Sequence, residues 1–379
     1  MRICVLVATY PLVSETFVYE PVRWLAERGH DVTVLAKRAG SLPREDGVET
    51  PVVAPRVLTP AREALAWLRA PGDALRRLPR VRVAARALLP EVAAADALLA
   101  HFGKVGERWL PVAAAARRPY AVFFHGNDAT GELRGRPRRY DALFRSGAGL
   151  IVNCDFMAER LAAAGAPRER LAVIPNGVDA SLAATTRPAS DARTVLTVGR
   201  LVEKKGVADS LAAFARAALP ADWRYEIVGD GPLRASLERA AQGAGAVRFR
   251  GFLPRARTLD AIRAASLLVL ASRTAASGDA EGTPNCVIEA ATCGVPVVAT
   301  RHGGIPELLP ADAEARGFLV REGDVDAIAR AIASLAASEA LRREWGEACR
   351  AHIRKRHSAD AHVTALVGAL ERVARVPSL

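Results

Sequence analysis

Two glutamates in one short stretch have the chemistry of a binding site for hydroxyl groups. Glu281 and Glu289 lie in DAEGTPNCVIEA, residues 279–290, with seven residues between them. An ionised carboxylate accepts hydrogen bonds from hydroxyl groups such as those of sugars and riboses. The stretch therefore predicts a polar binding site, and an acidic surface loop is the alternative.

The residues between the two glutamates predict the start of a helix. Pro284 suits the first helical position, and Thr283 before it is a favourable N-cap residue. Gly294 marks the end, so we expect a helix over residues 284–293. The free N–H groups at its start form an anion site. Two carboxylates beside such a helix end would suit a nucleotide sugar.

A basic loop provides a second set of groups. The segment VGRLVEKKG, residues 198–206, follows a strand-like run and carries Arg200 and Lys205. Two cations at a strand end form a plausible clamp for a pyrophosphate. Lys204 competes with Lys205 for this role, and the spacing does not decide between them. An ordinary basic loop is the alternative.

Short apolar runs alternate with longer helical stretches along the whole chain. Near-continuous apolar strands indicate parallel sheets buried on both faces, and the alternation predicts doubly wound α/β units. The polar, turn-rich segment 176–193 is the expected linker between two domains, with a ligand-binding cleft at the carboxyl ends of the strands. The expected strands are 2–8, 31–36, 97–102, 120–125, 149–154, 171–175, 194–199, 224–228, 247–251, 266–271, 296–300 and 317–320.

Length and composition fit two domains of a cytoplasmic protein. The chain has 379 residues, of which half are hydrophobic, enough for two ordinary cores. No apolar run approaches a membrane span, and the N-terminus lacks the features of a signal peptide. The five cysteines have no paired spacing, which indicates reduced thiols and neither disulfides nor a zinc site.

The net charge of +12 is unevenly distributed. Residues 56–86 carry eight arginines against Glu63 and Asp73, with leucines, alanines and Trp67 interleaved. A basic amphipathic segment can bind an anionic membrane surface, which would make the protein peripheral on the inner membrane face. A solvated helical face is the alternative. The chain contains no recognisable nucleic-acid-binding motif, so nucleic acid is not an expected partner.

Several motifs, taken together and in this order, resemble a known family. Gly199-Arg200 and Lys205-Gly206 are followed by the turn GDGP (229–232), the two glutamates, GVPVVAT (294–300) and GGIPE (303–307). This set is similar to the retaining glycosyltransferases of family 4, which have the two-domain GT-B fold. In the first half, HGND (125–128) and NGVD (176–179) resemble family segments. YPLVSETFVYE (10–20) and AHFG (100–103) are similar to a subgroup that builds exopolysaccharides such as colanic acid.

The resemblance implies which residues form each domain and which substrate each domain binds. Residues 1–180 would form the acceptor-side Rossmann-like domain and 181–360 the domain that binds the nucleotide sugar. Residues 361–379 would form a helix that packs back toward the first domain. The acceptor would be a glycan or a lipid-linked glycan, and the donor a UDP- or GDP-linked sugar.

The resemblance also assigns roles to single residues. Glu289 would bind the ribose and Glu281 the donor sugar, while Arg200 and Lys205 neutralise the leaving diphosphate and His125 lies near the reacting sugar. Further donor contacts would come from Gly229, Gly231, Phe252, Leu253, Gly282, Thr283, Pro284, Asn285 and Cys286. Contacts on the acceptor side would come from Ser14, Glu15, Thr16, His101 and Asp128.

The expected reaction needs no protein nucleophile and no metal. In this family, the acceptor is thought to attack on the face that the diphosphate leaves, so the two glutamates are not a glycosidase pair. The single Asp-x-Asp spacing, Asp324 to Asp326, precedes a helical run, and Asp324 is better explained as its N-cap. No cofactor is expected. Two other histidines, His101 and His302, are isolated in the sequence, and each is more readily explained as structural than as a metal ligand.

The chain departs from the family pattern at three places. The loop 10–16 replaces a glycine pair, residues 283–285 replace an aromatic-glycine form, and Pro21 should kink or restart the first helix.

Three other functions are alternatives. A sugar phosphorylase on the same fold would require phosphate, and a nucleotide-sugar epimerase would act on the donor without an acceptor. A sugar-binding protein of transport would have no use for a diphosphate clamp.

Overall fold

A computed structural model of the chain describes residues 1–44, 47–49, 53–57, 90–179, 181–182, 193–242 and 246–375. The chain divides into two compact units. The first comprises Met1–Ile174 with Asp360–Leu379, and the second comprises Pro175–Ala359. All but the first two residues of the basic segment 56–86 lie outside the described residues. Among the described helices, none has the length and apolar character to cross a membrane.

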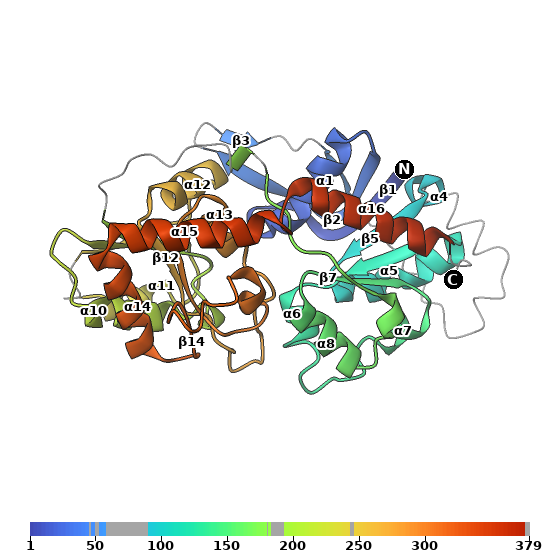
Figure 1. The fold of residues 1–379 in the computed structure, drawn as a ribbon. Helices are drawn as coiled ribbons and strands as arrows, with labels where there is room; N and C mark the ends of the chain where they lie inside the picture. The colour runs from blue at the N-terminus through green and yellow to red at the C-terminus, as the bar shows by residue number, and fades with distance from the viewer. Residues whose placement is uncertain are drawn as a thin grey trace. The chain divides into compact units, whose positions relative to one another are not determined.

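The first unit is built on a mostly parallel sheet. Its strands follow the order β3-β2-β1-β5-β6-β7-β8, with β4 paired to β2. Among the strands that the structure describes in this unit, only β3 runs antiparallel to its neighbour. The described elements are β1 Arg2–Leu12, η1 Val13–Glu15, α1 Thr16–Glu27, β2 Asp31–Arg44, β3 Gly47–Glu49, β4 Pro55–Val57, α4 Pro90–Ala94, β5 Ala97–His101, α5 Gly103–Ala116, β6 Tyr120–Phe123, α6 Gly126–Ala129, α7 Asp141–Arg145, β7 Gly149–Val152, α8 Asp155–Ala163, η3 Arg168–Arg170, β8 Leu171–Val173 and α16 Ala359–Arg375 (Figure 1).

The second unit holds a fully parallel sheet of six strands in the order β11-β10-β9-β12-β13-β14. Its described elements are β9 Thr194–Val198, η4 Glu203–Lys205, α10 Val207–Arg216, β10 Arg224–Val228, α11 Arg234–Ala240, β11 Val247–Gly251, α12 Arg255–Ala264, β12 Leu267–Leu270, α13 Asn285–Thr292, β13 Val297–Thr300, η5 Ile305–Leu308, β14 Leu319–Val320, α14 Val325–Ala337 and α15 Glu339–Arg354.

The strand order of the second unit fixes where a ligand is expected. The chain leaves β9 toward β10 on one side and returns to pair β12 with β9 on the other, so the order reverses between β9 and β12. Open α/β sheets bind ligands outside the carboxyl ends of the strands at this switch point. The two motifs that the sequence singled out lie here: 198–206 begins at the last residue of β9, and 279–290 spans the end of the loop after β12 and most of α13.

The two doubly wound units confirm the predicted fold class, and all twelve predicted strands are present. The short strands β3 and β4 were not predicted, because three-residue edge strands carry almost no periodic signal. The prediction that Pro21 restarts the first helix is wrong, since α1 continues through it from Thr16 to Glu27. Asp324 accepts a hydrogen bond from the N–H of Ala327 and caps α14, as predicted.

The last helix belongs to the first unit along most of its length. In Figure 1, α16 lies beside α1, and the ring centroids of Trp24 and His362 are 6.0 Å apart. Arg28, the C-cap residue of α1, also forms an ion pair with Asp360 of α16. The chain therefore crosses into the second unit near Pro175 and returns near Ala359.

Candidate functional site

The centre of the candidate site is a buried ion pair between the loops after β9 and β12. The ammonium of Lys205, at the end of η4, lies 2.9 Å from Oε1 of Glu281. Only 12% of the Lys205 side chain and 10% of the Glu281 side chain are exposed. The two groups that were predicted to neutralise a diphosphate and to bind a sugar are therefore in direct contact.

Both members of this pair are ionised. Burial acts to lower the pKa of Lys205, but the carboxylate of Glu281 outweighs it, so this pKa lies above its ordinary value. Burial acts to raise the pKa of Glu281, but Lys205 and then Lys204 outweigh it, so this pKa lies below its ordinary value. An ion pair withdrawn from water in this way holds both side chains in place.

The turn η4 also holds the rest of the loop after β12. Nζ of Lys204 lies 3.1 Å from Oδ1 of Asp279, and the carbonyl of Lys204 accepts a hydrogen bond from the N–H of Arg273 at 2.9 Å. The Glu203 carboxylate accepts from the N–H of Ala276 at 3.1 Å. The side chains of Glu203, Lys204 and Lys205 thus all bind the loop after β12, and Lys205, rather than Lys204, pairs with Glu281.

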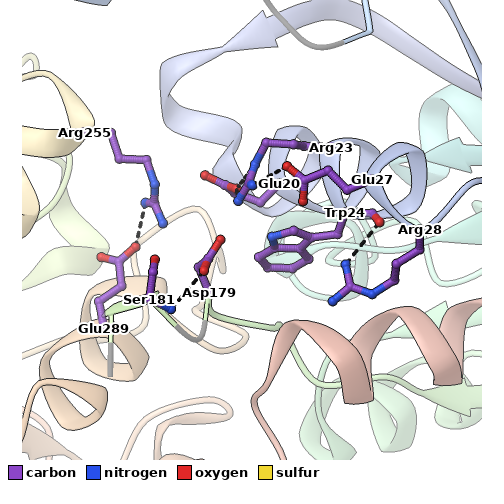
Figure 2. A network of polar contacts seen from close by, with 9 residues as sticks. All are labelled: Glu20, Arg23, Trp24, Glu27, Arg28, Asp179, Ser181, Arg255 and Glu289. Carbon is purple, nitrogen blue, oxygen red and sulfur yellow. Dashed lines mark hydrogen bonds and ion pairs between the residues drawn. The ribbon is translucent and has the colours of Figure 1, made fainter. Parts of the chain in front are cut away.

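Glu289 has a partner that the sequence did not reveal. Nη1 of Arg255, the first residue of α12, lies 2.7 Å from Oε1 of Glu289 (Figure 2). The Glu289 side chain is 8% exposed and that of Arg255 is 30% exposed. Arg255 follows Phe252, Leu253 and Pro254 after β11, so its position next to a proposed donor contact was the only sequence signal.

The helix between the two glutamates is α13, but its predicted cap is wrong. The N-cap residue is Pro284, without a side-chain hydrogen bond, and Thr283 precedes it. The buried hydroxyl of Thr283 has no hydrogen-bond partner among the described residues. The helix begins one residue later than predicted. Thr283 therefore lies one position before the N-cap, and its hydroxyl makes no capping hydrogen bond.

The start of α13 is held from the NGVD segment. Nδ2 of Asn176 donates to Oδ1 of Asn285 at 3.0 Å, and the carbonyl of Asn176 accepts from Nδ1 of His357 at 2.9 Å. Cys286 in the first turn is buried, and burial raises the pKa of its thiol to about 11. The thiol is therefore neutral beside the N–H groups of the helix start.

Other expected donor contacts line the same edge of the sheet. Arg200 follows β9, is exposed, and forms no ion pair with any residue that the structure describes. Gly229 and Gly231 follow β10, and Gly282 follows Glu281. Phe252 and Leu253 follow β11, and Phe252 is 46% exposed, unusual for so large an apolar side chain. The carboxyl ends of β9, β10, β11 and β12 thus bring these residues to one edge.

In the first unit, His125 and His101 form a buried pair. Nδ1 of His101, at the end of β5, lies 3.1 Å from Nε2 of His125, which follows β6. The His125 ring also packs on Phe17 with centroids 4.4 Å apart. His101, which is isolated in the sequence, meets this partner because parallel pairing of β5 and β6 places their carboxyl ends side by side. Nε2 of His101 is buried without a hydrogen-bond partner in the described part of the chain.

The remaining acceptor-side residues lie in the same unit. Oδ2 of Asp128 accepts from the N–H of His125 at 2.9 Å, and burial raises the pKa of Asp128 to about 6. Ser14 and Glu15 form the end of η1, and Thr16 begins α1. Asp128 is thus tied directly to His125, whereas the three residues at 14–16 follow β1, which is separated from β6 by β5.

The His101 ring makes the stability of the first unit sensitive to acid. Burial lowers its pKa from 6.5 to about 3, so between these pH values the ring is protonated in the unfolded state and neutral in the folded state. This stability is present above pH 6.5 and is lost as the pH falls, by about 2 kcal/mol at pH 5. We expect His101→Gln to lose less stability than the wild type between pH 7 and 5, in hydrogen-exchange measurements on this unit.

The raised pKa of Asp128 acts in the opposite direction over part of this range. The contribution of Asp128 to the free energy of unfolding falls as the pH rises from about 4 to about 6. Asp128 is present in both proteins, so the comparison of wild type with variant removes its contribution. An equal loss of stability in the two proteins would contradict a neutral, buried His101.

His302 is not isolated either. Its Nε2 lies 3.0 Å from the N–H of Glu281, and its Nδ1 lies 2.6 Å from Oε1 of Glu322. Among the residues described, no group of three or more His, Cys, Asp or Glu side chains is arranged to hold a metal ion. The site that emerges is a set of paired acids and cations around a helix start, suited to a ligand with hydroxyls and phosphates.

Family models match both halves of the chain. The family model for glycosyl transferases group 1 matches residues 181–352, and that for glycosyltransferase family 4 matches residues 14–182. The Salmonella typhimurium protein named as the colanic acid biosynthesis glycosyltransferase WcaL is 30% identical, over 88% of this chain and 90% of its own. The amylovoran biosynthesis glycosyltransferase AmsK of Erwinia amylovora is 28% identical, over 90% of this chain and 92% of its own.

Solved structures share the fold. The Anabaena protein HepE, in complex with UDP and glucose, superposes with a TM-score of 0.75 at 19% identity. The match covers 98% of this chain and all of that one. The sucrose-phosphate synthase of Thermosynechococcus elongatus has a TM-score of 0.72 at 20% identity, and covers 98% of both chains.

Proposed function

The chain belongs to glycosyltransferase family 4, and from this membership we propose that it transfers a sugar, with retention of configuration, from a nucleotide sugar to a growing glycan in exopolysaccharide biosynthesis. The observation that carries the proposal is the pairing of Lys205 with Glu281 and of Arg255 with Glu289 around the start of α13. The relatives named for colanic acid and amylovoran biosynthesis support the exopolysaccharide assignment.

The second unit is proposed to bind the donor. Glu289 binds the ribose hydroxyls and is held in place by Arg255, while Glu281 binds the hydroxyls of the donor sugar. The diphosphate lies toward Arg200, Lys205 and the N–H groups at the start of α13. Donors fixed before the reaction stabilise the negative charge of a leaving diphosphate by a few kcal/mol each. These groups replace a metal ion in the proposed mechanism.

The first unit is proposed to serve the acceptor, a glycan or a lipid-linked glycan. Because His125 is buried and its pKa lies well below the ordinary value, owing to burial and then to His101, its ring is neutral. A neutral imidazole can hydrogen-bond a hydroxyl without placing a full charge beside it. The acceptor attacks from the face that the diphosphate leaves, without a covalent enzyme intermediate.

UDP is the first nucleotide to test, because HepE was solved with UDP and with UDP-glucose. The protein would be incubated with UDP- and GDP-linked sugars in EDTA, without acceptor, and proton NMR would follow the anomer that is first released to water. We expect the nucleoside diphosphate to be released together with a free sugar that keeps the anomeric configuration of the donor. Release of the opposite anomer would rule out retention, and a requirement for inorganic phosphate would indicate a phosphorylase.

A further inference from the structure

We infer that His302 and Glu322 are positioning residues that fix the backbone of Glu281 through a single tautomer of the His302 ring. The inference rests on the proposed function, in which Glu281 binds the donor sugar. His302 follows β13 and Glu322 follows β14, so the relay comes from the two strands beyond β12. No motif that carries the family resemblance includes Glu322.

The hydrogen bonds determine the tautomer. The N–H of Glu281 is a donor only, so Nε2 of His302, 3.0 Å away, must accept and carries no proton. The ring proton of the neutral imidazole is then on Nδ1, which donates to Oε1 of Glu322 at 2.6 Å. The His302 side chain is 1% exposed, so water does not compete for either nitrogen.

Glu322 is itself held in one orientation. Its Oε2 accepts from the N–H of Thr274 at 2.9 Å, which leaves Oε1 to face His302. Burial acts to raise the pKa of Glu322, but the hydrogen bonds from Thr274 and His302 outweigh it, so this pKa lies below its ordinary value. An ionised carboxylate can only accept, and it therefore keeps the proton of His302 on Nδ1.

The same segment supports Glu281 by close backbone contact. Gly303 has a φ of +54°, and a Cβ atom there would lie 2.0 Å from the carbonyl oxygen of Glu281. The N–H of Gly304 donates to the carbonyl of Gly282 at 3.1 Å. The residues after β13 thus contact the backbone of Glu281 and Gly282, while Lys205 pairs with the Glu281 carboxylate.

A change of one atom in Glu322 tests the relay. In Glu322→Gln, the N–H of Thr274 donates to the amide oxygen, so the NH₂ group faces Nδ1 of His302. Because the NH₂ group can only donate, Nδ1 must then accept. The ring proton moves to Nε2, where it opposes the N–H of Glu281. We expect kcat to fall roughly 10²-fold, as for a displaced reacting group. The nucleoside diphosphate alone lacks the donor sugar that Glu281 would contact, so its affinity should change less than about twofold.

A matched variant and a double variant distinguish the relay from a general loss of structure. Glu314→Gln removes an exposed carboxylate that pairs with Arg301 and should leave kcat unchanged. In the double variant His302→Gln/Glu322→Gln, the amide oxygen at 302 can again accept from Glu281. Its kcat should therefore exceed that of Glu322→Gln alone, which additive defects would not give.

The tautomer is measured directly by nitrogen NMR of protein with isotope-labelled histidine, assigned by the signal that His302→Gln loses. A proton on Nδ1 in the wild type and on Nε2 in Glu322→Gln would support the relay. A proton on Nε2 in the wild type, or wild-type kcat in Glu322→Gln, would overturn it. If no nucleotide sugar bound either protein, the proposed function would fail, and the NMR result would still decide whether the relay exists.

Discussion

Replacing Lys205 with methionine is expected to abolish sugar transfer and to lower the free energy of unfolding of the second unit by about 3–5 kcal/mol. The methionine has nearly the volume of the lysine stem, so packing is preserved, but the carboxylate of Glu281 is left buried without its cation. Hydrogen exchange followed by mass spectrometry, on peptides of the second unit, measures the stability separately from that of the first unit.

Two further variants separate charge from structure. Lys204→Met changes the adjacent lysine, whose partner Asp279 is 23% exposed and can be solvated by water, so a smaller loss of stability is expected. The double variant Lys205→Met/Glu281→Gln removes both charges and should regain much of the stability without regaining transfer. If Lys205→Met alone retained wild-type transfer, Lys205 would have no part in the chemistry.

The second large effect is expected at Gly206, which carries the chain from η4 into α10. Its φ is +59°, and a Cβ atom there would lie 1.7 Å from the carbonyl oxygen of Ala271. Gly206→Ala must therefore separate the loop after β9 from the loop after β12. We expect the second unit to lose about 4 kcal/mol of stability, and transfer to fall because Lys205 moves with the turn.

Gly317→Ala provides the matched control. Gly317 has a φ of +76°, but no atom lies within 4 Å of the Cβ position, so this variant pays only the conformational cost. We expect that cost to be about 1–2 kcal/mol, with transfer retained. Equal losses of stability in the two variants would mean that the contact at Ala271 has no energetic effect.

The fold was predictable because its signal is local and repeated. Each central strand is a nearly continuous run of apolar residues, such as Leu267 to Leu270, and the helices between the strands impose parallel pairing. The order of the strands and the short edge strands β3 and β4 were not predictable in the same way. They depend on contacts between residues far apart in the sequence.

The candidate site was predictable only where the chemistry lies in short motifs. Glu281 and Glu289 are marked by their spacing, whereas the choice of Lys205 over Lys204 required the structure. Arg255 and Glu322 enter through side-chain partners 34 and 20 positions away. The pairing of His101 with His125 also required the register of β5 and β6. Sequence spacing indicates which groups are present, but only tertiary structure shows which groups neutralise one another.

The most direct test of the account is thermal unfolding with UDP, GDP and ADP and their sugar conjugates, on the wild type, Glu289→Gln and the exposed-site control Glu314→Gln. A ligand at about a hundred times its dissociation constant adds roughly 2.7 kcal/mol of stability, a shift of several degrees. We expect one base to stabilise the wild type and the control, and Glu289→Gln to lose most of the shift. No shift with any nucleotide, or an undiminished shift in Glu289→Gln, would contradict the assignment of the donor site to the second unit.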